Sequence, residues 1–368
     1  MKLTVQLKLL PSPSQSAALR TTLETANTAA NRISQLAWDN KEFRQFPLHR
    51  LCYRTIRDEF PLSSQIVVRL LAKVSDAYKL DRDKQRVFRK LGSISYDARI
   101  LDFQLASSTV SIWSVAGRLK ALPFVCGEQQ RKLLEFPRGE ADLILRDGNW
   151  YLNVSIEVPE ETEYAATEFL GVDFGIAEIA ADSDGNRYSG SKLNKVRHRN
   201  KALRRKLQRK GTKSAKRLLK KRARKESLFA RDVNHTISKR IVSLAKRTDR
   251  GIAIEELTGI RSRIRARRAQ RYTLHSWAFA QLGQFLSYKA QRAGVPVIRV
   301  DPAYSSQQCS SCGHIDKANR KSRAEFVCQS CGHTQHADEN GAVNLRLRGL
   351  AGAGAFNHPN AETSVSVG

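Results

Sequence analysis

The sequence predicts a multidomain α+β protein, in which a β-rich N-terminal half carries a helical insert and the C-terminal half is built on an α/β sheet. Two changes of apolar pattern and one pair of motifs support this prediction. The pattern alternates at the start of the chain, becomes helical, and alternates again before residue 160, while four cysteines stand in two pairs near the end. A length of 368 residues allows two or three domains of about 150 residues.

The N-terminal half begins with a strand, because residues 2–10 alternate apolar and polar side chains up to Pro11. From about residue 14 to 90 the apolar residues recur at helical spacing, and Ser63 fits the N-cap of the later helix. Short strands follow at 100–105, 109–115, 143–145 and 150–156, with a turn at Asp147-Gly148-Asn149. We expect a small β-barrel or sheet that the first strand joins.

The C-terminal half follows an acid-rich linker at residues 157–168. Three short strands come first, at 169–175, 178–182 and 187–189. Two long basic helices, a strand at 251–254, a helix at 277–292 and a strand at 295–300 follow. This order, βββαβαβ, is typical of an RNase H-like sheet.

The positive charge is concentrated in one segment. Lys plus Arg number 64 against 35 Asp plus Glu, which gives a formal net charge of +29. Residues 192–250 alone hold 24 basic and three acidic residues, on two helices with narrow apolar stripes. A solvated hairpin or a nuclear-localisation run would also be basic, but the apolar stripes indicate packing on another element. We expect this segment to contact phosphates, with binding that weakens as salt rises.

Two classes of protein are disfavoured. Uncharged apolar stretches fall short of the roughly 18 residues of a membrane span, and Lys2 and Lys8 interrupt the first residues where a secretory leader would be apolar. Six cysteines are too few for a disulfide scaffold of this length. We therefore expect no membrane partner and a reducing, cytoplasmic compartment.

Three acidic residues are candidates for a catalytic metal site. Asp173 and Glu255 stand where buried strands end, and Asp338 opens a C-terminal helix. Carboxylates from separate elements suit Mg²⁺, and two such ions about 4 Å apart would activate water and stabilise the leaving oxygen in a phosphodiester displacement. Taken singly, each acid has a simpler role, as a turn former, a salt-bridge partner or a helix cap.

Four cysteines have the spacing of a zinc ribbon. They form two Cys-x-x-Cys-Gly-His units, with 15 residues between the pairs: Cys309, Cys312, Cys328 and Cys331. A closed shell of four thiolates leaves no position for water, so we expect one structural Zn²⁺, with two redox pairs as the alternative. Cys52 and Cys126 lack partners at such spacing and are expected to be ordinary buried thiols.

These motifs resemble those of TnpB, the family of transposon-encoded RNA-guided nucleases related to type V CRISPR effectors. The resemblance is specific over about residues 168–348, and also includes Arg231 to His235. The motifs that carry it are Val172-Asp173-Phe174-Gly175, Ile254-Glu255-Glu256-Leu257, Tyr304 to Gly313, Cys328 to Gly332 and Ala337-Asp338-Glu339-Asn340. Over residues 1–160 it rests on the order of elements and on composition.

The resemblance implies a domain plan. A RuvC-like nuclease domain of RNase H-like fold, with a zinc-ribbon insert, would follow an N-terminal β-barrel wedge domain that carries a helical recognition insert. The expected boundaries are a wedge strand at 1–10, the recognition domain at 11–92, the wedge barrel at 93–160, the RuvC-like domain with its basic arm at 161–304, the zinc ribbon at 305–336, the RuvC C-terminal helix at 337–348 and a disordered tail at 349–368.

The resemblance also implies an activity. Such a protein, one per RNA, would carry a guide RNA from the right end of the transposon and recognise a short transposon-adjacent motif in double-stranded target DNA. Pairing reads the sequence while the protein reads shape and the short motif. Asp173, Glu255 and Asp338 take the places of the family's catalytic acids and would cut both strands with two Mg²⁺ ions, and the four cysteines take the places of its zinc ligands. The protein would lie on the nucleoid of a prokaryote when bound to DNA.

Two sets of residues are predicted to contact nucleic acid. Gln65, Arg69 and Lys73 share one face of a helix and would read base edges, with an ordinary polar face as the alternative. Phosphate contacts are predicted at Arg197, Arg199, Arg204, Arg205, Lys206 and Arg209. Arginines after Glu255, with Arg265 and Arg267 among them, would guide single-stranded DNA toward the acids.

Two other functions use the same residues. One is an RNA-guided DNA-binding repressor that does not cut, and the other is a transposase that performs DNA strand transfer, because fold alone does not decide function. The three intact acids favour the nuclease.

Overall fold

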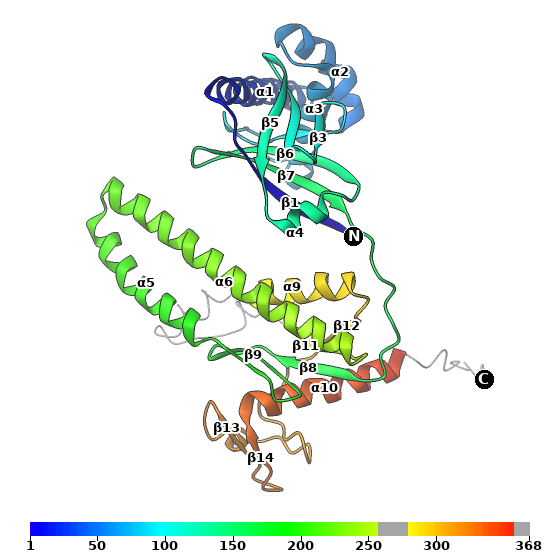
Figure 1. The fold of residues 1–368 in the computed structure, drawn as a ribbon, viewed down its shortest axis with the longest axis vertical. Coiled ribbons are helices and arrows are strands. Elements are labelled where there is room, and N and C mark those ends of the chain that lie inside the picture. Colours follow the sequence, from blue (N-terminus) through cyan, green and yellow to red (C-terminus); the bar gives the residue numbers. More distant parts are fainter. Residues whose placement is uncertain (257–278, 357–368) are drawn as a thin grey trace, which may run out of the picture. The chain divides into compact units, whose positions relative to one another are not determined.

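The structure is a computed structural model that describes residues 1–256 and 279–356. Within these residues the chain forms two compact units, Met1–Pro159 and the part from Glu160 onward, each with its own apolar core (Figure 1). The division falls in the acid-rich linker. None of the described helices is long and apolar enough to span a membrane.

The N-terminal unit contains a seven-stranded sheet in the order β2-β6-β7-β1-β5-β4-β3. Its strands are β1 (Lys2–Leu9), β2 (Ile94–Tyr96), β3 (Leu101–Gln104), β4 (Thr109–Ser114), β5 (Gly117–Val125), β6 (Arg138–Arg146) and β7 (Asn149–Glu157). The first strand joins the later ones as predicted, since β1 pairs with β7 along its whole length. The Tyr96 hydroxyl of β2 donates to the Trp113 carbonyl of β4 at 3.1 Å, so the sheet is nearly closed, and the complete barrel of the prediction is not formed.

Three long helices form the insert of this unit: α1 (Pro13–Asp39), α2 (Gln45–Glu59) and α3 (Ser64–Leu80). A shorter helix, α4 (Glu128–Leu133), follows β5. Ser12 and Gln15 form a capping box at the start of α1, and Ser63 caps α3 as predicted. The buried faces of the three long helices and of the sheet share one core.

The predicted helical pattern ends early, because the residues after Leu80 are not helical. Asn31 of α1 bonds both backbone groups of Phe88, accepting from its N–H at 2.7 Å and donating to its carbonyl at 3.0 Å. Asn27 of α1 donates to the Gly92 carbonyl at 2.9 Å. Side chains of α1 therefore replace the backbone bonds that a longer helix would have formed.

The C-terminal unit is built on a five-stranded sheet in the order β10-β9-β8-β11-β12. Its strands are β8 (Phe169–Asp173), β9 (Glu178–Asp182), β10 (Arg187–Ser189), β11 (Gly251–Glu255) and β12 (Val297–Val300). β8, β11 and β12 run parallel, and β9 is antiparallel to both of its neighbours. The element order βββαβαβ is therefore the one predicted, and it places the C-terminal ends of β8 and β11 at the same edge.

Helices cover both faces of this sheet. α6 (Lys213–Arg247) and α9 (Phe279–Arg292) pack on one face, where their apolar residues join those of β8 and β11, and α10 (Ala337–Phe356) crosses the other (Figure 1). α5 (Ser191–Lys210) forms a hairpin with α6, turning at Gly211 with a φ of +64°. α10 approaches β8 so closely that a Cβ on Gly171 would lie 1.9 Å from the Ala342 carbonyl oxygen.

The last helix is longer than predicted. α10 continues to Phe356, so the tail expected to be disordered from Gly349 is helical over its first residues. Gly349 lies against the sheet, where an added Cβ would stand 2.9 Å from Cβ of Ala253 and 3.1 Å from Cδ1 of Ile298. Packing there offsets the cost of about 1 kcal/mol that glycine imposes on a helix. The remainder of the tail lies outside the described residues.

Candidate active site and metal centre

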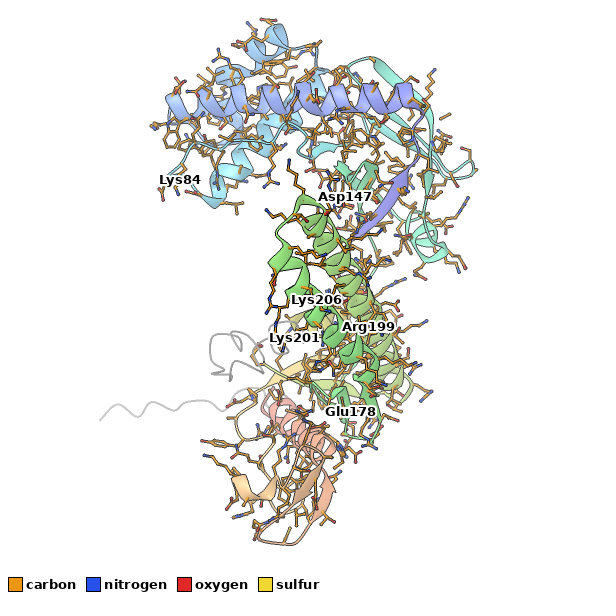
Figure 2. The ribbon with its side chains drawn as sticks, turned by 90° about the vertical axis from the view of Figure 1, so that its left-hand side faces the viewer. Lys84, Asp147, Glu178, Arg199, Lys201 and Lys206 are labelled. Carbon is orange, nitrogen blue, oxygen red and sulfur yellow. The ribbon has the colours of Figure 1, made fainter. Side chains whose placement is uncertain are left out.

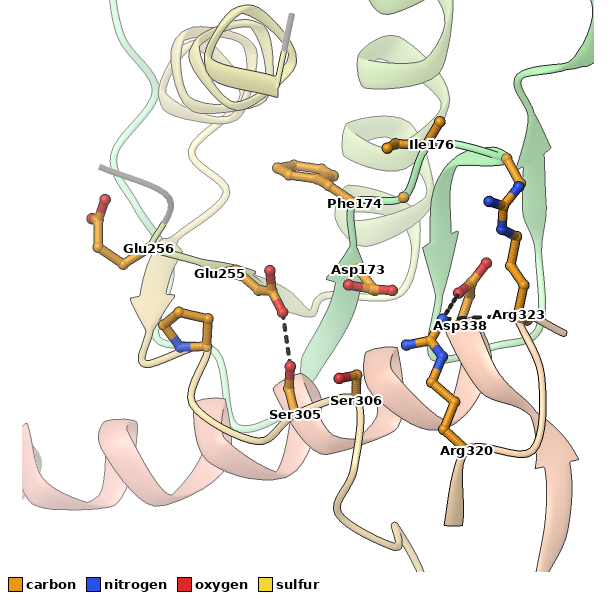
Figure 3. A pocket seen from close by; sticks show the side chains of 13 residues that line it. Asp173, Phe174, Ile176, Glu255, Glu256, Ser305, Ser306, Arg320, Arg323 and Asp338 are labelled. Atoms are coloured by element: carbon orange, nitrogen blue, oxygen red, sulfur yellow. Dashed lines mark hydrogen bonds and ion pairs between the residues drawn. The ribbon is translucent and has the colours of Figure 1, made fainter. Parts of the chain in front are cut away.

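The three predicted acids meet at one end of the sheet. Asp173 is the last residue of β8, Glu255 is the last residue of β11, and Asp338 lies in the first turn of α10. All three line one pocket of about 460 Å³, with Asp173 between the other two (Figure 3). The other lining residues are Phe174, Gly175, Ile176, Ala177, Glu256, Pro302, Ser305, Ser306, Arg320 and Arg323.

The electrostatics of the pocket centre on Asp173. Burial raises the pKa of Asp173 well above its usual range, and repulsion from the carboxylates of Glu255 and Asp338 raises it further, against a smaller opposite effect of Arg320. Burial also raises the pKa of Glu255. Acids whose ionisation is opposed by burial and by one another are a common feature of functional sites, because a bound cation relieves that cost.

Two polar side chains hold the outer carboxylates. Ser305 Oγ donates to Glu255 Oε1 at 2.8 Å, and an Arg320 guanidinium nitrogen donates to Asp338 Oδ1 at 3.0 Å (Figure 3). The sequence includes Ser305 within the motif Tyr304 to Gly313, but it predicts a role at the acids for neither Ser305 nor Arg320. Ser305 precedes the first cysteine pair and Arg320 lies between the pairs, in a stretch interpreted only as the spacer of a metal site. The sequence offers one signal for this contact: Arg320 is a basic residue in the spacer, and the acid Asp338 follows in the same part of the chain.

The acids fit a divalent cation by the chemistry of their donors. All three offer hard carboxylate oxygens, and Mg²⁺ takes one or two carboxylates while keeping several waters. In the described part of the chain, the four cysteines are the only group of three or more possible metal ligands whose ligand atoms gather around one point, and the three acids are not gathered in this way. Asp173, Glu255 and Asp338 are the residues of the pocket that would hold a cation.

The four cysteines are placed to hold a metal ion. Their Sγ atoms all lie within 4.8 Å of one another, and two pairs are closer, with Cys309 to Cys331 at 3.8 Å and Cys312 to Cys328 at 3.6 Å. Thiolates about 2.3 Å from a tetrahedral zinc ion stand about 3.8 Å apart. The observed separations therefore match a tetrahedral four-thiolate site.

The two cysteine units have the same local fold. In each, the N–H of the first cysteine donates to the carbonyl of the following histidine at 2.9 Å, and the glycine adopts a positive φ, +77° at Gly313 and +71° at Gly332. A short hairpin of β13 (Glu325–Val327) and β14 (Thr334–His336) carries the second unit. Backbone N–H groups of Ser330 and Cys331 donate to Cys328 Sγ at 3.4 and 3.5 Å, and such bonds stabilise the thiolate that a metal binds.

Comparison with known families bears on both sites. The model of a family described as Probable transposase, OrfB_IS605, matches residues 152–258, and the model of the Cas12f1-like TNB domain matches residues 279–345. The chain carries TnpB-type and Cas12f-like domains. The first match includes Asp173 and Glu255, and the second includes the four cysteines and Asp338.

The chain is also similar to individual proteins whose names match these two families. The chain is 26% identical to the CRISPR-associated endodeoxyribonuclease Cas12f1 of Sulfoacidibacillus thermotolerans, over 89% of this chain and 92% of that protein. It is 29% identical to the putative RNA-guided DNA endonuclease InsQ of Escherichia coli (strain K12), over 55% of each chain. Its fold is similar to that of Cas12f1 in a complex with sgRNA and target DNA, with a TM-score of 0.63, 16% identity and coverage of 91% of this chain and 83% of that one.

The residues predicted to read bases lie on one face of α3, but that face packs within the N-terminal unit. Gln65 donates to the Asp97 carboxylate, and Arg69 pairs with Glu140. Lys73 Nζ donates to the Asn27 side chain and to the Ser93 carbonyl, each at 2.8 Å, and burial lowers its pKa to about 8. A base-reading role for these three residues would require these contacts to break, and that role stays a prediction.

The predicted phosphate contacts on α5 divide by exposure. Arg199, Arg205, Lys206 and Arg209 are exposed, and Figure 2 shows Arg199 and Lys206 on the hairpin. Arg197 is buried, with 4% of its surface exposed, and donates to Asn194 at 3.4 Å, so it faces the inside of the unit rather than a ligand. Arg204 is half-buried beside Glu226 at 3.6 Å. Arg265 and Arg267 lie outside the described residues.

Proposed function

We propose that this protein is an RNA-guided DNA endonuclease that cuts target DNA at a Mg²⁺-dependent, RuvC-like site formed by Asp173, Glu255 and Asp338. The observation that carries the proposal is the meeting of three carboxylates, from β8, β11 and α10, in one pocket that two arginines also line. The sheet order and the mixed strand directions support an RNase H-like nuclease domain. The names of the relatives, an endodeoxyribonuclease and an RNA-guided DNA endonuclease, support an RNA guide and a DNA substrate.

The residues of the pocket have distinct roles in this proposal. Asp173, Glu255 and Asp338 would hold the Mg²⁺ ions through their carboxylate oxygens. Bound there, the ions would activate water and stabilise the leaving oxygen in an in-line displacement. Ser305 fixes one oxygen of Glu255 and leaves the other for a cation. Arg320 and Arg323 also line the pocket, where their positive charge would stabilise the phosphate of the scissile bond.

The proposed partners are a guide RNA, from the right end of a transposon, and double-stranded target DNA next to a short transposon-adjacent motif. The exposed basic residues of α5 would neutralise phosphates of the bound nucleic acid. One Zn²⁺ would occupy the four-cysteine site, where the sulfur separations fit it and no ligand position remains for water. That ion would hold the hairpin and the two cysteine units together, next to the pocket.

The test is cleavage of a plasmid that carries the sequence matched by the copurified RNA. We expect the wild-type protein to cut this plasmid in Mg²⁺, and Asp173→Ala to abolish cutting while retaining RNA. Glu325→Gln serves as the matched control, because it removes an exposed carboxylate outside the pocket. Target binding without cutting by the wild-type protein would indicate a repressor, and joining of transposon ends without RNA would indicate a strand-transfer transposase.

A further inference from the structure

One polar face of α10 forms hydrogen bonds with residues 305–310, the segment that leads into the first cysteine pair. Asn340, Asn344 and Arg348 are spaced at four, so they share one side of the helix. Asn344 Nδ2 donates to the carbonyls of Ser305 at 2.9 Å and Gln308 at 2.7 Å. Asn340 Nδ2 donates to the Gln308 carbonyl at 2.8 Å.

Two further hydrogen bonds join the same face of α10 to this segment. Asn340 Oδ1 accepts from the Ser310 N–H at 3.0 Å, inside the first cysteine unit, and Arg348 donates to Gln308 Oε1 at 2.7 Å. Both asparagines are almost completely buried, with exposed fractions of 0% for Asn340 and 2% for Asn344. Buried amides are costly unless they are bonded, and these two have partners in one short segment.

The segment 305–310 contributes to both the acid site and the four-cysteine site. Ser305, which is 4% exposed, donates to Glu255, and Cys309 supplies a ligand of the sulfur cluster only four residues later. The segment forms turns rather than a strand or helix: the Gln308 N–H donates to the Tyr304 carbonyl at 2.9 Å, and Gln308 makes a single β-bridge with Ile315. Tyr304 has a φ of +60°, which costs a residue of this kind on the order of 1 kcal/mol or more. These local bonds shape the turns, and the side chains of α10 attach the turns to the helix that also carries Asp338.

We propose that Asn340 and Asn344 are positioning residues that couple the four-cysteine site to the cation affinity of the acid site. They act through Ser305: the loaded cysteine site and the asparagines together fix the segment, and the segment fixes the carboxylate of Glu255 relative to Asp173 and Asp338. The inference rests on the proposed function, because it concerns cations held by those acids. A purely structural role would lower stability without changing the affinity for divalent cations.

The experiment measures Mn²⁺ binding to the zinc-loaded full chain by electron paramagnetic resonance. Each protein is measured with and without the additional substitution Asp173→Asn. The Mn²⁺ binding that is lost with this substitution is assigned to the acid site. Partners that orient a metal ligand typically change metal affinity 10- to 100-fold. We expect Ser305→Ala to weaken the Mn²⁺ affinity of this site about 10-fold, and Asn344→Leu to weaken it at least as much.

A double variant tests whether the residues act through one another. If Asn344 acts through Ser305, Asn344→Leu combined with Ser305→Ala binds Mn²⁺ no more weakly than Asn344→Leu alone. Asn27→Leu is the matched control, because Asn27 is also a fully buried amide bonded to backbone carbonyls, but in the N-terminal unit. It should lower stability and leave Mn²⁺ affinity unchanged.

Removal of zinc tests the coupling itself. Stripping zinc from the wild-type protein should weaken Mn²⁺ binding by about the factor seen in Asn344→Leu, and should have little further effect in that variant. Wild-type Mn²⁺ affinity in Asn344→Leu, or after zinc removal, would overturn the inference while leaving the proposed nuclease site standing. Absence of Mn²⁺ binding that depends on Asp173 in the wild-type protein would overturn the acid site as well.

Discussion

Gly171 of β8 offers the sharpest test of how the fold positions the acids. Its Cα faces α10, and a Cβ at this position would lie 1.9 Å from the Ala342 carbonyl oxygen and 2.5 Å from the Arg346 nitrogen. Both atoms are backbone, so no rotation of a side chain relieves the clash. Ordinary contact begins at 3.4 Å, so Gly171→Ala would push this part of α10 about 1.5 Å from the sheet.

That shift carries Asp338 away from Asp173, because Asp338 lies one turn before Ala342 on the same helix. Overpacking of a core costs about 1–3 kcal/mol of unfolding free energy, and a misplacement of about 1 Å at a reacting group costs on the order of 100-fold in rate. We therefore expect Gly171→Ala to lower the free energy of unfolding by about 2 kcal/mol and plasmid cleavage by about 100-fold.

The assays are urea unfolding and single-turnover cleavage of a matched plasmid, at a temperature where the variant is fully folded. Gly352→Ala is the control, because it makes the same chemical change in the same helix where nothing lies within 4 Å of the added Cβ. It should stabilise the helix by about 0.5–1 kcal/mol and leave cleavage unchanged. Wild-type stability and cleavage in Gly171→Ala would refute the packing of α10 on β8 as the determinant of the site.

Three further predictions follow from the charges. Asp173→Asn should raise the melting temperature of the metal-free protein, and the increase should be larger at pH 8 than at pH 5. The folded state raises the pKa of Asp173 above its ordinary value of 3.8. The stability of the wild-type protein therefore falls as the pH rises from 3.8 through the raised pKa, whereas asparagine does not ionise. A variant that melts below the wild-type protein at pH 8 would contradict this. Stripping metal from the cysteines should increase amide hydrogen exchange in residues 309–336 and spare β1 and β7; protection that survives chelation would exclude a structural ion. Replacing Arg199, Arg205, Lys206 and Arg209 by Gln should reduce the slope of log affinity for single-stranded RNA against log salt by up to about 3; an unchanged slope would remove α5 from the interface.

The sequence predicts the C-terminal sheet well because its strands are short apolar runs that end in acids or turns. Parallel neighbours then bring Asp173 and Glu255 to one edge whatever the details of packing. The cysteine spacing is equally direct, since ligand geometry is encoded in a few local residues. What the sequence does not encode locally is how the outer acids are held: Ser305 and Arg320 reach Glu255 and Asp338 only through tertiary contacts.

The N-terminal half shows the opposite limit. β5 escapes prediction because Pro123 interrupts it and only Leu122 and Phe124 are buried along it. The helical spacing of Gln65, Arg69 and Lys73 correctly places them on one face of α3. Spacing does not reveal that Asp97, Glu140 and Asn27 approach that face from other elements and bond to it.

The most direct test of the proposed cation site is a structure of the wild-type protein determined by diffraction with Mn²⁺ present, recorded at the manganese absorption edge. Anomalous density in the pocket, in contact with Asp173 and at least one of Glu255 and Asp338, is the predicted result. Density confined to other sites, with all three carboxylates free of metal at saturating Mn²⁺, would contradict it.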